Sequence, residues 1–392
     1  MSAALHQALV LVVNAGSATL KFGLYPAEGP ALWLGAYEGL EPGGRPELRL
    51  DGVRQPLDEG QGSGFGLALA HLMQTLSERG LAVSAVAHRI VHGGERFVAP
   101  CLLDEQALRD LHQYDSLAPL HQPHNLAGVA ACAQAMPGVP QIGCFDTAFH
   151  ASLPDVERRL PIDRELARQG LRRYGFHGLS YEYIVHRLTH IDPALARGRV
   201  IAAHLGNGAS LCAIRDGRSI DTTMGFTALD GLMMGTRCGA IDPGVVLHLQ
   251  THRGMSAQAV EDMLYRQSGL LGVSGLSSDM RTLSDSTDPH AEEAISLFAW
   301  RAAKEAGALT ASLGGLDGIV FTAGIGEHHA DIRSRICRQL AWLGIELDES
   351  ANSANQPVIS TAGSRVTVRV IPTDEERIIA LHIMNLLLGD AA

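Results

Sequence analysis

A strand–turn–strand pattern occurs twice in this chain of 392 residues, once near the N-terminus and once half a chain later. Residues 10–22 read VLVVNAGSATLKF and residues 200–214 read VIAAHLGNGASLCAI. In each, an apolar run is followed by a polar residue (Asn14 or His204), then by small residues and a second apolar run. This order predicts a β-hairpin whose turn brings backbone N–H groups and hydroxyls close to an anion. The repetition therefore predicts a duplicated fold that holds one polyphosphate from both sides.

Helix and strand patterns alternate after each hairpin, which predicts an α/β protein with mixed sheets. The length predicts two domains. Residues 26–62 are expected to form short antiparallel strands and turns, and residues 350–364 a polar loop. The predicted helices cover residues 64–79, 104–114, 125–135, 242–252, 256–266 and 290–312, and two more begin near residue 330 and at Thr373. The further predicted strands cover residues 85–94, 139–150, 317–327 and 366–371.

Composition excludes several classes of protein. The net charge of −11 argues against nucleic acid or an anionic membrane as the main partner. The six cysteines are scattered, which is typical of free thiols in a reducing cytosol. No apolar run approaches the roughly 20 residues of a membrane span, and no signal peptide precedes the first strand. We therefore expect a soluble, cytoplasmic protein.

Three glycine-rich segments follow apolar strands: residues 14–21 (NAGSATLK), 204–210 (HLGNGAS) and 322–327 (TAGIGE). Glycine allows the backbone to approach a ligand closely, so three such segments in one chain predict nucleotide binding. No GxxxxGK[ST] motif occurs, which argues against a P-loop. Lys21, one of two lysines in the chain, is either a solvated strand charge or a phosphate contact.

Two arginines and a histidine are the strongest candidates for anion binding. Arg89 (HRIVHGG) and Arg237 (MGTRCG) lie beside glycines, where guanidinium groups could hold carboxylate or phosphate, although an arginine is often only a structural ion-pair partner. His177 lies in a glycine-flanked turn before a helix, where it could donate to a phosphoryl oxygen. His121 and His124 have metal-like spacing, but we expect Pro123 to break the helix that would align them, and zinc is not favoured.

Asp146 and Glu375 are the best candidates for binding magnesium or its waters. Asp146 follows a predicted strand, at the sheet edge where ligands bind in α/β proteins. For Glu375 a structural role is equally favoured, because Thr373 and Glu376 have the spacing of a capping box at the start of the last helix.

Together these segments resemble the acetate and propionate kinase family of the actin-like ATPase superfamily. The resemblance runs in order from residue 10 to residue 376, essentially the whole chain. Its matching stretches are NAGSATLKF, HRIVHGGERF, LAPLHQPHN, FDTAFH, YGFHGLSYEY, HLGNGAS, MGFTALDGLMMGTRCGAIDPG, SGLLGVSGLSSDMR, FTAGIGE and IPTDEE.

The resemblance implies two related actin-like (ribonuclease H-like) domains, with mixed β-sheets flanked by helices and an active site in the interdomain cleft. Their expected bounds are residues 1–149 with 376–392, and residues 150–375. It also implies reversible transfer of the γ-phosphoryl group of ATP to acetate, giving acetyl phosphate and ADP. Magnesium, or manganese in its place, would be the metal, and a homodimer would form through the second domain.

The resemblance also implies roles for individual residues. Asp146, His177, Arg237 and Arg89 would be catalytic, with Arg89 and Arg237 also holding the carboxylate, and Asn14 and Glu375 would bind metal. The substrate methyl group would lie in a pocket of Val91, Leu120 and Phe176, and His121 would line the same cleft. The nucleotide would contact Ser17, Thr19, Lys21, His204, Leu205, Gly206, Asn207, Gly208, Asp279, Met280, Arg281, Gly324, Ile325 and Gly326.

This chemistry needs no general base, because a carboxylic acid with a pKa of about 4 is already ionised at neutral pH. It needs instead neutralisation of two anions and an in-line approach. Direct transfer is preferred to a phosphoenzyme, although Glu375 or Asp146 could accept a phosphoryl group in principle.

Five positions bear on specificity. Thr19, Met280, His328 and Ala228 depart from the family pattern, and Ala228 leaves room for a longer acyl chain. Val91 agrees with the pattern of the acetate enzymes. The alternatives are a propionate or butyrate kinase, or a non-enzymatic actin-like ATP-binding module, which would not need Arg89, Arg237 and His177. Neither the physiological direction nor the nucleotide preference follows from the sequence.

Overall fold

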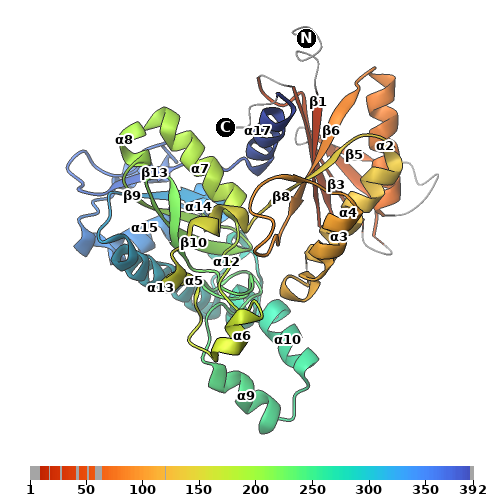
Figure 1. Cartoon of the computed structure of the whole chain (residues 1–392). Coiled ribbons are helices and arrows are strands. Elements are labelled where there is room, and N and C mark those ends of the chain that lie inside the picture. The colour runs from red at the N-terminus through yellow and green to blue at the C-terminus, as the bar shows by residue number, and fades with distance from the viewer. Residues whose placement is uncertain are drawn as a thin grey trace. The chain divides into compact units, whose positions relative to one another are not determined.

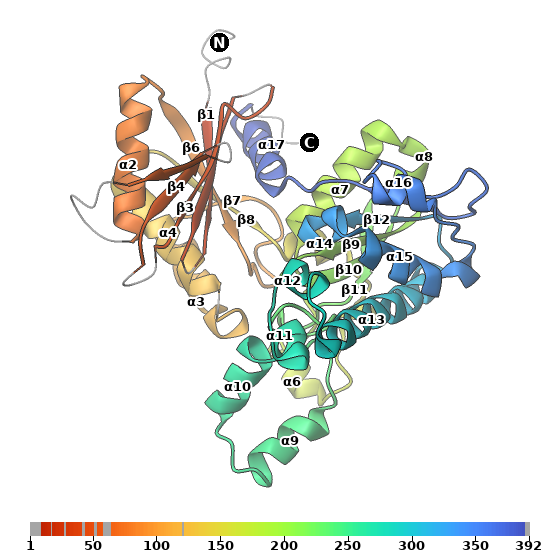
Figure 2. The ribbon, with the colours of Figure 1, turned by 180° about the vertical axis from the view of Figure 1, so that it is seen from behind.

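A computed structural model describes residues 9–16, 18–26, 29–40, 44–50, 53–57, 64–119 and 121–388. The chain divides into two compact units. Unit 1 comprises residues 1–148 and 374–392, and unit 2 comprises residues 149–373. Figures 1 and 2 show the ribbon of both units from opposite sides.

Unit 1 is built on a mixed sheet in the order β5-β4-β3-β2-β1-β6-β8-β7. Its strands are β1 (Leu9–Ala15), β2 (Leu20–Pro26), β3 (Trp33–Glu38), β4 (Glu47–Leu50), β5 (Val53–Pro56), β6 (Val83–Ile90), β7 (Cys101–Leu102) and β8 (Gln141–Phe145). Its helices are α2 (Phe65–Glu78), α3 (Glu105–His112), the 3₁₀ turn η1 (Asp115–Leu117), α4 (Gln122–Ala135) and α17 (Glu375–Leu388).

Unit 2 is built on a mixed sheet in the order β11-β10-β9-β12-β13. Its strands are β9 (Arg199–Leu205), β10 (Ala209–Arg215), β11 (Arg218–Thr222), β12 (Gly318–Thr322) and β13 (Thr367–Val370). The 3₁₀ turn η2 (Ala148–Ser152) leads into it. Its helices are α5 (Asp155–Arg158), α6 (Arg164–Arg168), α7 (Gly178–Ile191), α8 (Pro193–Ala196), α9 (Pro243–Thr251), α10 (Ala257–Arg266), α11 (Gly269–Ser274), α12 (Met280–Ser284), α13 (Pro289–Leu313), α14 (Ala323–His328), α15 (Ala330–Gln339), the 3₁₀ turn η3 (Ala341–Leu343) and α16 (Glu349–Ser353).

The two sheets share one strand order. β3-β2-β1-β6-β8 in unit 1 corresponds to β11-β10-β9-β12-β13 in unit 2. In each, three antiparallel strands are followed by two that run parallel to the first strand of the hairpin. The predicted hairpins are β1–β2 and β9–β10, so the duplicated α/β fold is confirmed.

The first strand of each hairpin is central and therefore apolar on both faces. Val10 to Val13 have no exposed surface, and Leu11 and Val13 pack against α2 and α4. Figures 1 and 2 show α17 on the opposite face of this sheet from α2 and α4. In unit 2, Val200 and Ala202 of β9 pack against α7, and α13 covers the other face. This burial leaves the polar residues at the strand ends to form the sites.

Several local predictions were wrong. Residues 317–327 do not form one strand, because β12 ends at Thr322 and residues 323–328 form helix α14. Residues 350–353 of the predicted polar loop belong to α16. Pro123 does not break a helix, because it lies in the first turn of α4, where its missing N–H is tolerated. Thr373 does not cap the last helix. The carboxylate of Asp374 accepts from Arg377 N–H at 2.9 Å instead, and α17 begins at Glu375.

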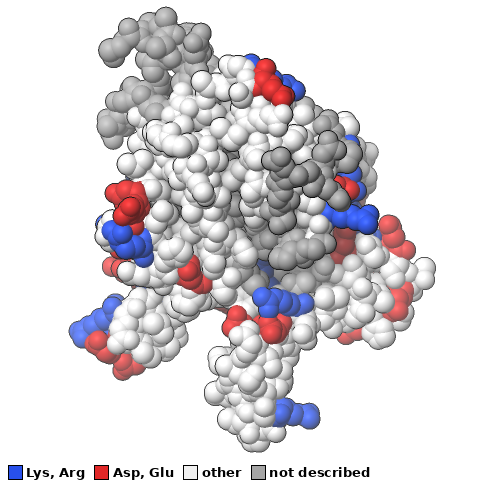
Figure 3. All heavy atoms as spheres, turned by 90° about the vertical axis from the view of Figure 1, so that its right-hand side faces the viewer, with Lys and Arg blue, Asp and Glu red and all other residues white. Residues whose placement is uncertain are grey.

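Charged side chains on the face shown in Figure 3 form small groups in which basic and acidic residues are neighbours. Within the described residues, no helix combines the length and apolar character that a membrane crossing requires.

Candidate active site

In unit 1, Arg89, Asp146 and Glu375 form one ion-paired group. Arg89 Nε and Nη2 donate to the two carboxylate oxygens of Asp146 at 3.1 and 2.7 Å. Arg89 Nε also lies 3.4 Å from Glu375 Oε2. The parallel pairing of β6 with β8 places Arg89 beside Cys144, so Asp146 emerges next to it at the strand end. The sequence-predicted Arg89, Asp146 and Glu375 are thus brought together.

This group is mostly buried, with side-chain exposures of 20% for Arg89, 2% for Asp146 and 13% for Glu375. Burial by itself disfavours the charge of Arg89, but Asp146 and Glu375 outweigh it and raise the Arg89 pKa. The pKa of the neighbouring Glu376 is raised, first by its burial and then by Glu375. Two carboxylates thus face the one guanidinium of Arg89, and carboxylate oxygens are ligands that a divalent cation prefers.

Two side chains of α4 hold the backbone around this group. Asn125 accepts from Val91 N–H at 3.0 Å and donates to the carbonyl of Ala15 at 2.7 Å. Gln122 accepts from His92 N–H at 3.0 Å. Asn125 therefore ties the loop after β6 to the turn after β1. The sequence prediction assigned no role to Gln122 or Asn125, although both lie in the quoted HQPHN stretch.

The turn after β1 is tight. Asn14 faces Lys21 in the hairpin register, and Gly16 N–H donates to the carbonyl of Thr19 at 2.8 Å. Lys21 is exposed, whereas Val91 is buried. The predicted site residues Ser17 and Leu120 lie outside the described residues. The backbone of this turn is compact enough for N–H groups to face an anion.

In unit 2, His177 and His204 stack on each other, with ring centroids 4.2 Å apart and planes inclined by 18°. His177 Nδ1 lies 2.8 Å from Ser210 Oγ, and His204 Nδ1 lies 2.8 Å from Ser180 Oγ. Ser180 Oγ lies in turn 2.9 Å from Thr373 Oγ1. Each imidazole is therefore held through Nδ1. Ser210 pairs with His204 in the hairpin register, so strand alternation was the signal that could have found it.

Arg237 and His177 converge on the glycine turn between β9 and β10. A Cβ atom at Gly208 would lie 3.1 Å from Arg237 Nη2 and 3.4 Å from His177 Nε2. Burial lowers the pKa of Arg237, whose Nη1 donates to the carbonyl of Ala228 at 2.6 Å. The guanidinium of Arg237 and the Nε2 atom of His177 thus lie close together beside the Gly208 turn, which has no side chain. This arrangement is suited to binding an oxyanion.

The remaining predicted nucleotide residues lie on elements around this turn. Gly206 N–H donates to the carbonyl of Gly208 at 3.1 Å, and the backbone carbonyl of Asn207 accepts from Gly235 N–H at 3.0 Å. At the start of α12, Asp279 pairs with Arg281 at 2.8 Å, which lowers the Asp279 pKa, first through that hydrogen bond. Of the other predicted residues, Leu205 is the last residue of β9 and Met280 lies buried in α12. Gly324, Ile325 and Gly326 lie in α14.

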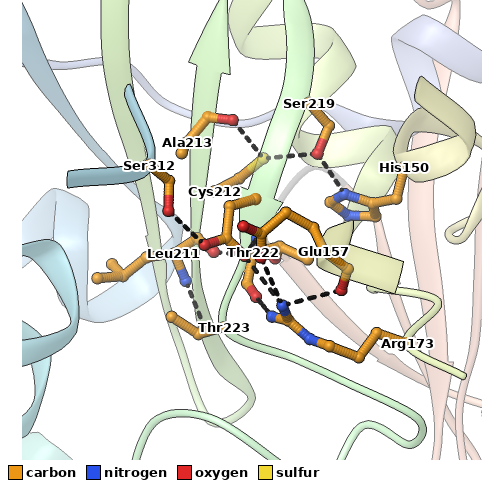
Figure 4. A network of polar contacts seen from close by, with 11 residues as sticks. His150, Glu157, Arg173, Leu211, Cys212, Ala213, Ser219, Thr222, Thr223 and Ser312 are labelled. Atoms are coloured by element: carbon orange, nitrogen blue, oxygen red, sulfur yellow. Dashed lines mark hydrogen bonds and ion pairs between the residues drawn. The ribbon is translucent and has the colours of Figure 1, made fainter. Parts of the chain in front are cut away.

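A partly buried polar network supports the segment that carries His177 (Figure 4). Arg173 pairs with Glu157 at 3.3 Å and with Asp221 at 3.2 Å, and it also donates to the carbonyl of Thr222. Ser312 of α13 donates to Asp221 at 2.8 Å. The four residues from Arg173 to Phe176 are thereby anchored to the sheet. Phe176, predicted to line a methyl pocket, is buried.

Comparison with known proteins agrees with the resemblance seen in the sequence. The family model described as "Acetokinase family" matches residues 9–381. An acetate kinase from Rhodopseudomonas palustris (strain ATCC BAA-98 / CGA009) is 51% identical over 97% of this chain and 99% of its own length. The crystal structure of Porphyromonas gingivalis acetate kinase aligns with a TM-score of 0.87 and 36% identity, over 97% of this chain and all of that one. The crystal structure of a propionate kinase from Francisella tularensis aligns with a TM-score of 0.90 and 36% identity, over 96% of this chain and 98% of that one.

The duplicated α/β fold, the glycine turns and the partly buried arginines, together with these relatives, identify a kinase. The chain belongs to the acetokinase family. The family predicted from the sequence motifs is therefore confirmed.

Proposed function

We propose that this protein transfers the γ-phosphoryl group of ATP to acetate, reversibly and by direct in-line transfer, giving acetyl phosphate and ADP. The observation that carries the proposal is the convergence of Arg237 and His177 on the Gly208 turn. Relatives that cover almost the whole chain are acetate kinases, which supports the same substrates. In acetyl phosphate the phosphoryl group keeps a high transfer potential, so it can be returned to ADP and the reaction is reversible.

The residues of unit 2 have distinct proposed tasks. Arg237 binds the transferring phosphoryl group and the carboxylate, because guanidinium groups bind both in bidentate fashion. His177 donates to the phosphoryl oxygens from Nε2, since its Nδ1 is engaged by Ser210. His204, Leu205, Gly206, Asn207, Gly208, Asp279, Met280, Arg281, Gly324, Ile325 and Gly326 contact the nucleotide. Because acetate is already ionised, no proton has to be removed from the nucleophile.

The residues of unit 1 would act on the same substrates. Arg89 neutralises the acetate carboxylate, and Val91, Leu120 and Phe176 contact its methyl group. Ser17, Thr19 and Lys21 bind phosphates. Asp146 keeps Arg89 oriented through its two hydrogen bonds. The main catalytic contribution of the residues of both units is to reduce the repulsion between the acetate carboxylate and the phosphates of ATP.

Magnesium fits the donor set of unit 1. Asp146 and Glu375 would supply carboxylate oxygens, and Asn14 would supply an amide oxygen. Among the described residues no group of three or more histidine, cysteine or acidic side chains could hold a metal by itself. Mg²⁺ or Mn²⁺ binds through one or two carboxylates plus substrate phosphates and water, a role that Asp146 and Glu375 could fill. When bound, the metal would neutralise phosphate charge.

Hydroxylamine trapping of acyl phosphate tests the proposal. The enzyme is incubated with ATP and Mg²⁺ and with acetate, propionate or butyrate in parallel. Acetate is expected to give the fastest hydroxamate formation, and absence of hydroxamate from every acid would overturn the kinase activity. Incubation with γ-labelled ATP but no acid tests direct transfer, since a labelled protein would indicate a phosphoenzyme. Arg253→Gln, on an exposed loop, is the control for Arg237→Gln.

Propionate is the second candidate substrate. The aligned propionate kinase supports it, as does the small side chain of Ala228, whose carbonyl contacts Arg237. One methylene group changes the specificity by about 10- to 200-fold. Val91→Ala is expected to raise the ratio of propionate to acetate kcat/KM by about tenfold. An unchanged ratio would show that Val91 does not contact the acyl chain.

We also propose a cytoplasmic homodimer formed through unit 2. Its exposed apolar side chains include Leu247 at 60%, Trp300 at 59% and Trp342 at 70%, which is typical of surfaces that bind another protein. All six cysteines are free, as in reducing compartments. Light scattering on a sizing column tests the dimer, and a monomer mass at micromolar concentration would exclude it.

A further inference from the structure

Five arginine side chains line one hollow on the surface of unit 2. The hollow has a volume of about 260 Å³, and its lining includes Arg158, Arg159, Arg164, Arg168 and Arg172. We call it the arginine hollow. All five lie in or next to α5 and α6, which are labelled in Figure 1. Among the described residues that line it, Asp155 is the one carboxylate.

Three other carboxylates of this segment have hydrogen-bond or ion-pair partners of their own. Glu157 pairs with Arg173 in the partly buried network of Figure 4. Asp163 accepts from Glu165 N–H at 2.8 Å and caps α6. Glu165 lies 3.2 Å from Arg168, in an exposed pair that contributes little. Arg159 and Arg164 are the arginines of the hollow on which the argument for excess positive charge rests.

Arg159 and Arg164 carry the excess charge. Both are exposed, and within the described part of the chain neither has a carboxylate within ion-pair distance. Arg158 donates to a neutral group, the carbonyl of Ala151. Like charges on neighbouring side chains repel one another, and a bound anion would relieve this repulsion. The protein as a whole carries a net charge of −11, which makes the local excess unusual for this chain.

We propose that the arginine hollow binds a small organic molecule that carries two phosphate groups. Guanidinium groups bind phosphate in bidentate fashion, and several of them around one hollow match several phosphate oxygens. The volume exceeds what a single phosphate group fills, since one water occupies about 30 Å³ in the liquid. None of the five arginines belongs to the residues proposed to bind ATP or acetate. The site is thus separate from the proposed reaction and stands without it.

Titration calorimetry with fructose 1,6-bisphosphate as the probe tests the site. MgADP is present throughout, so that the nucleotide site is filled. The wild-type protein is expected to bind one probe molecule per chain. The double variant Arg159→Gln/Arg164→Gln is expected to bind it at least about tenfold more weakly, because charge-assisted hydrogen bonds to phosphate are lost. The double variant Arg215→Gln/Arg253→Gln removes the same charge from exposed positions elsewhere in unit 2 and is expected to bind within about twofold of wild type.

Three outcomes would overturn the proposal: no binding to the wild type, equal weakening in both double variants, or binding of inorganic phosphate as tight as that of the bisphosphate. A single-stranded oligonucleotide forms a further arm, and its binding in place of the bisphosphate would assign the hollow to nucleic acid instead. Arg159→Lys/Arg164→Lys keeps the charge but removes the planar fork. It is expected to bind with intermediate affinity, which separates bidentate recognition from general attraction.

Discussion

His150 Nε2 donates a hydrogen bond to the carbonyl oxygen of Phe176 at 2.9 Å, one residue before His177. Its Nδ1 lies 2.8 Å from Ser219 Oγ, which acts as the donor because burial keeps this imidazole neutral. His177 has a φ of 58°, a left-handed conformation that is unfavourable for a residue with a side chain. Gly175 packs directly on the His150 ring, where a Cβ atom would lie 2.6 Å from it. His150 thus supports the strained segment that presents His177.

Replacement of His150 by phenylalanine should therefore reduce catalysis. The variant leaves the Phe176 carbonyl without its donor, so His177 shifts, and we expect kcat to fall by about tenfold or more with KM for ATP nearly unchanged. His150→Gln retains an N–H donor and should recover part of the loss. Steady-state kinetics of both variants measure the effect. Equal kcat values in the two variants would contradict a role for the hydrogen bond.

Asn125 should contribute strongly to stability. Asn125→Ala removes the acceptor of the Val91 N–H and a donor to the Ala15 carbonyl. Each unsatisfied buried group costs about 1–3 kcal/mol, so the free energy of unfolding should fall by about 2–4 kcal/mol. Urea denaturation measures it. The matched control is Asn385→Ala at an exposed position of α17, expected within about 0.5 kcal/mol of wild type. A similar loss in both variants would refute the bridging role of Asn125.

The hairpins could be predicted from the sequence because the alternation of apolar and polar residues is local. The ends of parallel strands also predicted that Arg89 and Asp146 would lie near ligands. Asn125 could not be assigned, because its two partners lie at the end of β1 and just after β6, which only the folded sheet brings together.

Residues 323–328 show the same limit for a secondary-structure element. Their glycines favour a turn, since glycine destabilises a helix. The guanidinium of Arg333, which is fully buried, donates to the carbonyls of Gly326 and Glu327 at 2.9 Å. These hydrogen bonds satisfy carbonyl groups at the C-terminal end of α14. A prediction from local helix propensity does not take them into account.

The free energy of unfolding should fall below pH 6.5. Burial lowers the pKa of His88 and of His150 to about 4, compared with about 6.5 in an unfolded chain. Between these values the unfolded state binds more protons than the folded state, so stability is lost as the pH falls from 6.5 toward 4. Above pH 6.5 both states are neutral at these residues and this contribution is constant.

Urea denaturation at pH 7.5, 6 and 5 checks this dependence. His88→Gln can still donate to Gln141, whose Oε1 accepts from His88 Nε2 at 2.7 Å. The variant removes one titrating group, so the slope below pH 6.5 should decrease by up to about 1.4 kcal/mol per pH unit. An unchanged slope would show that His88 does not contribute to it.

Ala323→Gly should stabilise the protein. Ala323 begins α14 with a φ of 63°, a left-handed conformation that an L-residue with a Cβ atom adopts at a cost of about 1 kcal/mol or more. Glycine adopts this conformation freely, which removes the cost, although glycine also has more conformational entropy than alanine in the unfolded chain. With both effects included, the free energy of unfolding should rise by about 0.5–1 kcal/mol. Ala308→Gly, at an exposed position inside α13, provides the matched control. The same substitution there should lower the free energy of unfolding by about 0.5–1 kcal/mol, because its backbone is right-handed. Urea denaturation of the two variants compares the signs directly, and destabilisation by Ala323→Gly would mean that the left-handed backbone stores no strain at this position.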